Sequence, residues 1–385
     1  MRYESARLAD FSAVSEKTRR RGFDSSFFII VIMLLIMGVI MVLSSSYARA
    51  YYDPGNITGG NAVYYFIRQL LYAVLGCFAM IFASHIPMKV YRRYSLHFLI
   101  ATVVLLLLVP FIGVKANGAR RWLGVGGLTI QPSELAKLAV IMFFSSMICR
   151  IGTGMRSFRY GIIPFAAVIG LIIGLLVLEP HFSASVIIIA IGGAMMFLGG
   201  VRLGWFAAAF GAAGAAVAVL LTFFPYASGR INTWRDPFSS SSDEGYQIVQ
   251  SLYSIGSGGL SGLGLGGSRQ KFLYLPEEHN DFIFSVVCEE TGFIGAALVL
   301  CLFSLLILRG YWIAIHCRSR YSLLVCAGIT TLLAIQVFLN VAVVTNLIPC
   351  TGISLPFFSY GGTALLIELF EMGIILSASR DIQIN

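Results

Sequence analysis

The sequence predicts an all-α polytopic membrane protein, with about ten transmembrane helices and a large extracytoplasmic loop between the seventh and the eighth. Two observations predict this fold class: 58% of the 385 residues are hydrophobic, and only 12% are charged. Soluble domains carry about 25% charged residues, so the composition excludes a soluble fold. The net charge of +9 does not indicate a nucleic-acid partner. Basic residues in so apolar a chain anchor loops beside the membrane or attract anionic lipid.

Apolar runs long enough to cross a bilayer divide the chain, since a spanning helix needs about 20 mostly apolar residues. We interpret 1–25 as a cytoplasmic tail and 26–380 as one transmembrane domain, whose large outer loop is 225–280. The first apolar run lacks a small-residue cleavage site and is therefore expected to be a retained span rather than a signal peptide. The predicted spans are 26–47, 63–84, 96–114, 132–149, 161–178, 183–200, 204–224, 281–308, 321–345 and 357–378.

The distribution of Lys and Arg predicts the orientation. With the N-terminus in the cytoplasm, 17 of the 27 basic residues fall in inner segments, which agrees with the positive-inside rule. Both termini are then cytoplasmic. The large loop is outside, as are 48–62, 115–131, 179–182 and 346–356.

The seven cysteines indicate neither a disulfide framework nor a zinc site. They are scattered through apolar segments, without CxxC spacing or clustered histidines. No metal ligands are predicted.

One carboxylate, Asp281, stands where the polar loop meets the eighth apolar run. A carboxylate at such a depth is costly unless it is paired or used, so Asp281 is predicted to be functional and is our candidate general base. His279 is a candidate proton relay or a solvated interface histidine. Glu277 and Glu278 are further carboxylates whose spacing from Asp281 the sequence does not fix.

A second polar segment combines interface residues with an ion pair. Trp122 beside Arg121 suits headgroup depth, where a guanidinium can pair with phosphate. Pro132 is suited to the first position of a helix. Glu134 and Lys137 are three residues apart, so they share a helical face and can pair, either as a structural pair or as the lining of a polar cavity.

Seven basic residues lie in outer segments, against the general bias of Lys and Arg toward the inner side. Each alone could be an ordinary solvated charge, but their convergence on one face would suit an anionic ligand at the outer leaflet. They are Lys115, Arg120, Arg121, Arg230, Arg235, Arg269 and Lys271.

Three further segments have recognisable patterns. Residues 243–255 are predicted to form a short amphipathic helix at the outer surface. Residues 256–267 contain seven glycines, which we interpret as a flexible re-entrant hinge rather than a phosphate-binding loop, because no strand precedes them and no Gly-Lys-Ser/Thr ends them. Prolines and glycines break the helical path over 347–362, which is tolerated at membrane depth only in a protein interior or beside a wet cavity. Ser359 in that segment is a predicted substrate-binding residue.

These segments, in this order, resemble the SEDS family (shape, elongation, division and sporulation) of bacterial peptidoglycan polymerases. The resemblance covers nearly the whole chain beyond the first 20 residues. It is closer to the FtsW and SpoVE branches than to RodA. It rests on the runs NGARRW and QPSELAK, DEGYQ, YLPEEHNDFIF with EETG, and TGISLPFFSYGG.

The resemblance implies an inverting glycosyltransferase of the bacterial cytoplasmic membrane that joins lipid II units into glycan strands at the outer face. It implies a catalytic Asp281 and makes Arg121, Trp122, Glu134 and Lys137 important for activity. It also implies a class B penicillin-binding protein as partner, together with other division or sporulation membrane proteins.

We expect Asp281 to deprotonate the GlcNAc 4-hydroxyl of incoming lipid II, and basic residues to stabilise the departing undecaprenyl pyrophosphate. The predicted basic residues are Lys115, Arg120, Arg121 and Lys137. No cofactor is required by the sequence, although a divalent cation such as Mg²⁺ could assist. His181 stands where relatives commonly have an acid, and Glu368 and Glu371 in the last span receive no role.

Two alternatives remain open at this point. A lipid II flippase would also have about ten spans, broken helices and intramembrane charge. A non-catalytic scaffold for the transpeptidase would keep the fold without using Asp281. Polymer made by the purified protein would separate the enzyme from both.

Overall fold

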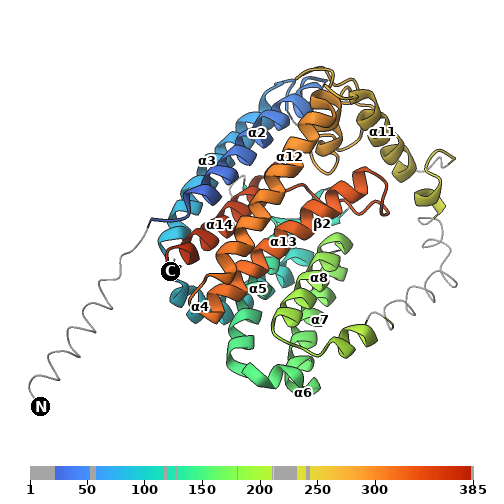
Figure 1. Ribbon diagram of the computed structural model, residues 1–385. Coiled ribbons are helices and arrows are strands. Elements are labelled where there is room, and N and C mark those ends of the chain that lie inside the picture. The colour runs from blue at the N-terminus through green and yellow to red at the C-terminus, as the bar shows by residue number, and fades with distance from the viewer. Residues whose placement is uncertain are drawn as a thin grey trace, which may run out of the picture.

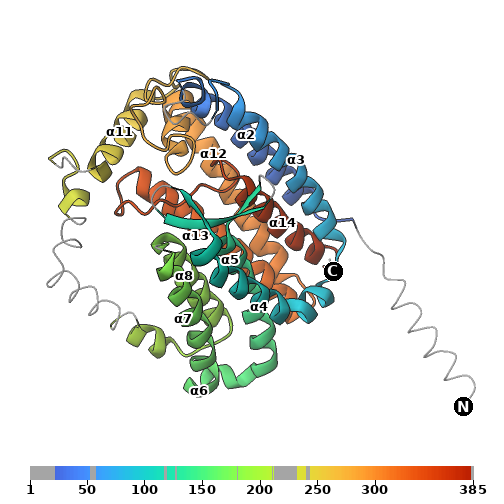
Figure 2. The ribbon, with the colours of Figure 1, turned by 180° about the vertical axis from the view of Figure 1, so that it is seen from behind.

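The structure of the protein is a computed structural model that describes residues 22–52, 58–116, 119–125, 128–179, 181–209, 211, 232–239 and 243–382. Within these ranges the chain is a bundle of long apolar helices with a small sheet at one end (Figures 1 and 2). The named helices are α2 (Ser25–Tyr52), α3 (Tyr64–His85), α4 (Met88–Ile112), α5 (Pro132–Ile151), α6 (Phe158–Gly161), α7 (Ile163–Leu178), α8 (Phe182–Leu198), α11 (Asp243–Gly258), α12 (Ile283–Ile315), α13 (Arg320–Val344) and α14 (Gly362–Ser379).

The predicted fold class is confirmed, and nine of the ten predicted spans correspond to helices in the described ranges. Eight segments are long and apolar enough to cross a membrane, and α8 is a shorter apolar helix of 17 residues. The largest boundary error is in α4, which begins at Met88 instead of 96 because the basic stretch before the apolar run is already helical. The seventh predicted span, 204–224, lies mostly outside the described residues, so the count of ten stays a prediction.

A small antiparallel sheet occupies the segment that we expected to be a plain loop between α4 and α5. The strands are β1 (Val114–Ala116), β2 (Ala119–Val125) and β3 (Leu128–Ile130), in the order β1-β2-β3. Leu123 of β2 faces Ile130 of β3 across the register. The sheet leads directly into Pro132, the first residue of α5.

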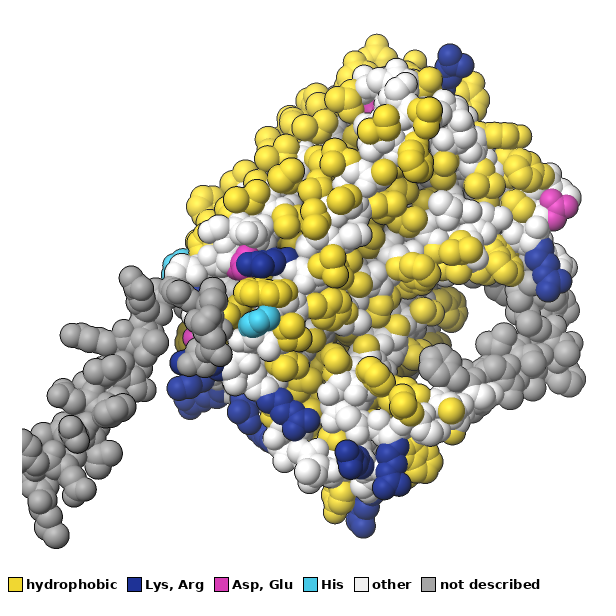
Figure 3. Space-filling model, in the orientation of Figure 1, with side chains coloured by type: hydrophobic (Ala, Val, Ile, Leu, Met, Phe, Trp, Pro, Cys, Tyr) yellow, Lys and Arg dark blue, Asp and Glu magenta, His cyan; other side chains and the backbone are white. Residues whose placement is uncertain are grey.

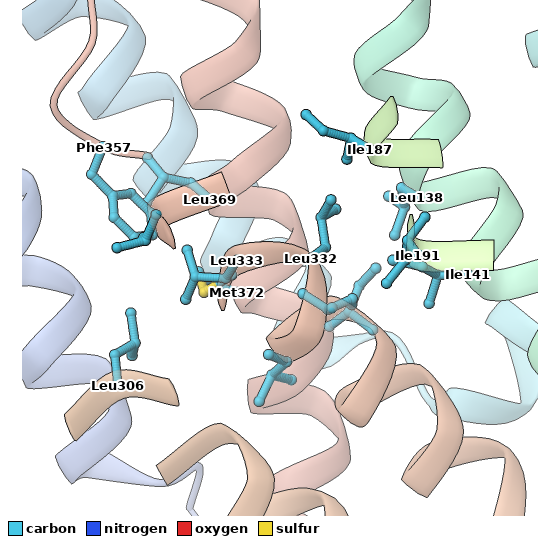
Figure 4. Packing of buried hydrophobic residues seen from close by; sticks show 14 of the residues in the cluster. Leu138, Ile141, Ile187, Ile191, Leu306, Leu332, Leu333, Phe357, Leu369 and Met372 are labelled. Carbon is cyan, nitrogen blue, oxygen red and sulfur yellow. The ribbon is translucent and has the colours of Figure 1, made fainter. Parts of the chain in front are cut away.

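The centre of the bundle is formed by α5, α13 and α14, the most buried of the spanning segments. Figure 4 shows how α13 joins the two sides: Leu332 points toward side chains of α5 and α8, whereas Leu333 lies beside Met372 of α14. Glycine allows closer contact between α14 and α3, because a Cβ at Gly373 would overlap the backbone of Met80. Such close approach favours helix association inside a membrane, where packing is the main attraction.

The two ends of the bundle differ in charge. Yellow apolar side chains cover most of the visible face in Figure 3, and dark-blue Lys and Arg gather along its lower edge. We call this edge the basic end. The exposed basic residues at the turns of this end are Lys89, Arg92, Arg93, Arg150, Arg156, Arg159, Arg202, Arg318 and Arg320. The opposite end, which carries the sheet, α11 and residues 345–361, is the pocket end.

The glycine-rich segment 256–267 is held against α12, so the interpretation as a flexible hinge is wrong. Backbone N–H groups of Leu263 and Gly264 donate to the carbonyl oxygens of Glu289 and Glu290, each over 3.0 Å. The α12 backbone is non-helical at Gly292, where φ is 66°, and a Cβ there would collide with the backbone of the glycine-rich segment. Glycine is therefore required on both sides of this contact.

A buried ion pair holds the same segment to α2 and α12. Lys271 is only 3% exposed, and its Nζ lies 3.0 Å from Glu290 Oε1 and 2.8 Å from the carbonyl oxygen of Gly266. Ser44 of α2 accepts a hydrogen bond from the same Nζ over 3.1 Å and donates to Glu290. Lys271 thus fastens three parts of the chain together.

The expected amphipathic helix is α11, which rests on α12 rather than only lying at the surface. Ile248 is buried, as predicted for the apolar stripe. The deepest contacts, however, are polar: the Ser251 and Ser285 hydroxyls lie 2.7 Å apart, and Ser254 donates to the Ser285 carbonyl oxygen.

Candidate functional site

A pocket of about 600 Å³ opens at the pocket end, between the sheet, α5, the start of α8 and the start of α14. Five of the predicted site residues line it together: Arg121, Trp122, Glu134, Lys137 and Asp281. They come from β2, the first two turns of α5 and the turn before α12. The fold thus brings together segments that are up to 160 residues apart.

Asp281 is held in a turn just before α12 by contacts with the broken segment 347–362. The N–H of Tyr360 donates to the His279 carbonyl oxygen over 2.8 Å. The Ser359 hydroxyl donates to the Asn280 carbonyl oxygen over 2.8 Å and accepts from the N–H of Leu355. These bonds fix the backbone on the N-terminal side of Asp281.

The Asp281 carboxylate lies against Gly352 at the pocket wall. A Cβ added to Gly352 would stand 3.1 Å from Asp281 Oδ2, and Gly352 has a φ of +60°. The pKa of Asp281 is raised to about 6: burial is the main cause and the charge of Glu277 adds to it, while His279 and Arg121 oppose the shift. Such a carboxylate is still about nine-tenths ionised at pH 7 and is a stronger base than an ordinary aspartate.

Arg121 is a pocket cation whose charge acts on the Asp281 carboxylate. Burial lowers the pKa of its guanidinium, and the charges of Asp281 and Glu179 counteract that effect. Arg121 and Trp122 are both half-buried on β2 and line the pocket. A partly buried guanidinium facing a pocket suits an anionic group of a ligand.

The predicted pair of Glu134 and Lys137 is present. Lys137 Nζ lies 2.5 Å from Glu134 Oε2, and the two side chains are 3% and 12% exposed. Pro132 occupies the start of α5, as expected. Because both side chains line the pocket, the cavity-lining interpretation is supported over a structural pair remote from any opening.

Three predicted site residues do not line the pocket among the described residues. Arg120 is exposed and donates to the carbonyl oxygen of Pro110 over 3.0 Å. His279 is buried beside Tyr65 and Tyr360, with ring centroids 4.8 and 5.9 Å away, so it is not a solvated interface histidine. Ser359 supports the Asp281 turn instead of facing a ligand.

The expected convergence of seven basic residues is also wrong. Lys271 pairs with the buried Glu290, and Arg235 and Arg269 are exposed and do not line the pocket. The side chain of Lys115 and residue Arg230 lie outside the described residues. The difference arises because a basic residue in a loop sequence can pair with a distant buried acid, which spacing alone does not reveal.

The structure adds pocket residues that were not among the predicted site residues. Arg68 of α3 contributes a second guanidinium, which stacks over the Tyr64 ring at 4.6 Å. His181, the residue just before α8, also lines the pocket. Burial and the charges of Arg121 and Lys137 together lower its pKa to about 3, so its imidazole is neutral at pH 7. No local pattern marks Arg68, because it lies in a predicted apolar span, whereas His181 was noted only as a departure from the residue common in relatives.

Glu179, next to the pocket wall, is 1% exposed. Burial raises its pKa to about 8, with Arg121 opposing, so the carboxyl is mostly protonated at pH 7. The pocket therefore carries less negative charge than its sequence suggests. Among the described residues no cluster of three His, Cys, Asp or Glu side chains could hold a metal ion.

Comparisons with known proteins agree on one family. Residues 24–384 match the model of the "Cell cycle protein" family that covers FtsW, RodA and SpoVE. Stage V sporulation protein E of Bacillus subtilis (strain 168) is 40% identical over 347 residues, which are 89% of this chain and 93% of that protein. A protein of Trichlorobacter lovleyi named "Probable peptidoglycan glycosyltransferase FtsW" is 37% identical, over 90% of each chain.

Solved structures show the same fold. A chain of the structure described as "Structural coordination of polymerization and crosslinking by a peptidoglycan synthase complex" has a TM-score of 0.76 and 26% identity, covering 93% of this chain and 98% of that one. The crystal structure of rod shape determining protein RodA from Thermus thermophilus has a TM-score of 0.66 and 24% identity, covering 94% of this chain and 98% of that one.

Proposed function

The chain belongs to the FtsW, RodA and SpoVE family of cell cycle proteins, and we propose on this premise that it is a peptidoglycan glycosyltransferase that polymerises lipid II. The observation that carries the proposal is the position of Asp281, a carboxylate of raised pKa in a pocket that also holds Arg121, Arg68 and the Glu134–Lys137 pair. A base facing cationic side chains is the combination that transfer from a pyrophosphate donor requires.

The proposed reaction is a single displacement. Asp281 accepts the proton of the GlcNAc 4-hydroxyl of incoming lipid II, and the oxygen attacks the anomeric carbon of the lipid-linked strand. The bond from that carbon to the pyrophosphate oxygen breaks with inversion, and its electron pair leaves with undecaprenyl pyrophosphate. The proton held by Asp281 passes to water.

The pocket cations act on the leaving group. We assign Arg121 and Arg68, which line the pocket, to stabilising the charge that develops on the pyrophosphate, which is commonly the larger catalytic contribution. Lys137 is engaged with Glu134, so we assign the pair to the pocket's charge balance rather than to direct transfer of a proton. Involvement of Mg²⁺ stays a prediction, tested by measuring synthesis with and without a chelator.

We place the protein in a bacterial cytoplasmic membrane with the basic end and both termini in the cytoplasm. The gathering of exposed Lys and Arg at one end supports this orientation. The pocket end, with Asp281, then faces outward. Similarity to a chain of a peptidoglycan synthase complex supports a crosslinking partner, which we propose to be a class B penicillin-binding protein. Contacts with other division or sporulation membrane proteins stay a prediction.

The experiment is strand synthesis by the purified protein from lipid II, with polymer separated by gel electrophoresis. Asp281→Asn should abolish polymer, whereas Asp236→Asn should not, because Asp236 is an exposed aspartate outside the pocket. Near-normal turnover by Asp281→Asn would end the assignment of the base. Relocation of lipid without polymer by the unaltered protein would favour the flippase, and neither activity would favour a scaffold.

A further inference from the structure

A buried amide in α13 makes an uncommon double contact beside the candidate base. Asn340 is 1% exposed, and its Nδ2 donates to the carbonyl oxygen of Asp281 over 2.8 Å and to that of Ile353 over 2.7 Å. Both hydrogens of the amide are therefore used by two segments that are separate in sequence. Ile353 directly follows Gly352, against which the Asp281 carboxylate lies.

The orientation of this amide is fixed by its partners. Turning it over would place Oδ1 against two carbonyl oxygens, which cannot donate. In the observed orientation Oδ1 is buried and has no hydrogen-bond partner among the described residues. A buried acceptor without a partner is unfavourable, as is an amide inside an apolar helix, so stability alone does not account for Asn340.

We propose that Asn340 is a positioning residue for the base: its carboxamide sets the spacing between Asp281 and Gly352 and so directs the carboxylate into the pocket. This inference rests on the proposed function. The second link between the same segments, from Ser359 to the Asn280 carbonyl oxygen, holds the residue before Asp281. Asn340 therefore acts on Asp281 itself, and losing it leaves the bonds from Ser359 and Tyr360 to maintain the fold.

The test compares Asn340→Leu and Asn340→Asp with Asn346→Asp. Asn346 lies just after the same helix and its Nδ2 also donates to a backbone carbonyl oxygen, that of Trp234 over 3.2 Å, but it does not line the pocket. The control thus loses the same kind of bond by the same substitution. The measured quantity is the single-turnover rate constant with lipid II already bound, because this constant is independent of the fraction of folded protein.

Both Asn340 variants should lower this rate constant about tenfold to a hundredfold, the scale expected for a misplaced reacting group, while substrate affinity changes little. Asn346→Asp should keep the normal constant. Asn340→Asp should also move the acidic limb of the pH profile to higher pH, because a second carboxylate disfavours ionised Asp281. A purely structural asparagine would leave the constant of the folded protein unchanged.

The unaltered protein and Asp281→Asn are measured in parallel. If the unaltered protein polymerises and Asp281→Asn does not, a normal rate constant in Asn340→Leu overturns the role of Asn340 alone. If Asn340→Leu is not recovered folded, a normal constant in Asn340→Asp overturns that role equally. If the unaltered protein makes no polymer, the proposed function itself fails.

Discussion

Replacing Lys271 by methionine should detach the glycine-rich segment from α2 and α12. The substitution keeps the apolar stem but removes the charge that Glu290, Ser44 and the Gly266 carbonyl oxygen contact at 2.8–3.1 Å. Removing one partner of a buried pair costs about 3–5 kcal/mol, because the other charge stays buried. Glu290 still accepts a hydrogen bond from the Ser44 hydroxyl, so we expect a value near the lower limit, about 3 kcal/mol.

Thermal unfolding in detergent measures this cost, and hydrogen exchange of residues 256–271 shows whether the loss is local. Arg269→Met is the matched control, because it removes the same charge from an exposed side chain two residues away. Adding Glu290→Gln to Lys271→Met should recover part of the lost stability, since the unpaired charge is then gone. If Lys271→Met unfolds at the same temperature as Arg269→Met, the buried pair does not hold the segment.

Three other outcomes are expected. Polymer synthesis should fall as the pH drops through about 6, because protonation of Asp281, whose pKa is raised to that value, removes the base; a rate profile between pH 5 and 8 checks this. Gly352→Ala should reduce turnover about tenfold or more by displacing the carboxylate, whereas Gly256→Ala, where a Cβ meets open space, should be normal in the same assay. Lys137→Met should lower the unfolding temperature more than the double substitution with Glu134→Gln does, because the single change leaves a nearly buried carboxylate unpaired.

Local sequence patterns were sufficient for the parts of the site that depend on neighbours along the chain. Glu134 and Lys137 are one helical turn apart, so their pairing follows from helix geometry. Asp281 was identifiable because a carboxylate at the start of an apolar run is expensive in a membrane. Composition and the length of apolar runs likewise predicted the helical bundle.

The errors concern residues whose partners are distant in sequence. Lys271 looked like a ligand-facing loop cation, and only the fold brings Ser44, 227 residues away, into contact with it. Asn340 sat within a predicted span with no local signal of its contact to the Asp281 turn, 59 residues earlier. The strands β1 to β3 were missed because they are short, and they resemble a turn-rich loop until they pair.

The bend in α12 has a consequence for where chemistry takes place. The helix has 33 residues, and Gly292 divides it into a short first part and 24 residues from Gly292 to Ile315. At 1.5 Å per residue the longer part extends about 36 Å, enough to cross the roughly 30 Å of a bilayer's acyl layer by itself. The residues before Gly292 are therefore not needed to cross the acyl layer, and this short part instead carries the Asp281 turn to the pocket. A sugar chain made there could grow into water while the lipid tails of its substrates stay immersed.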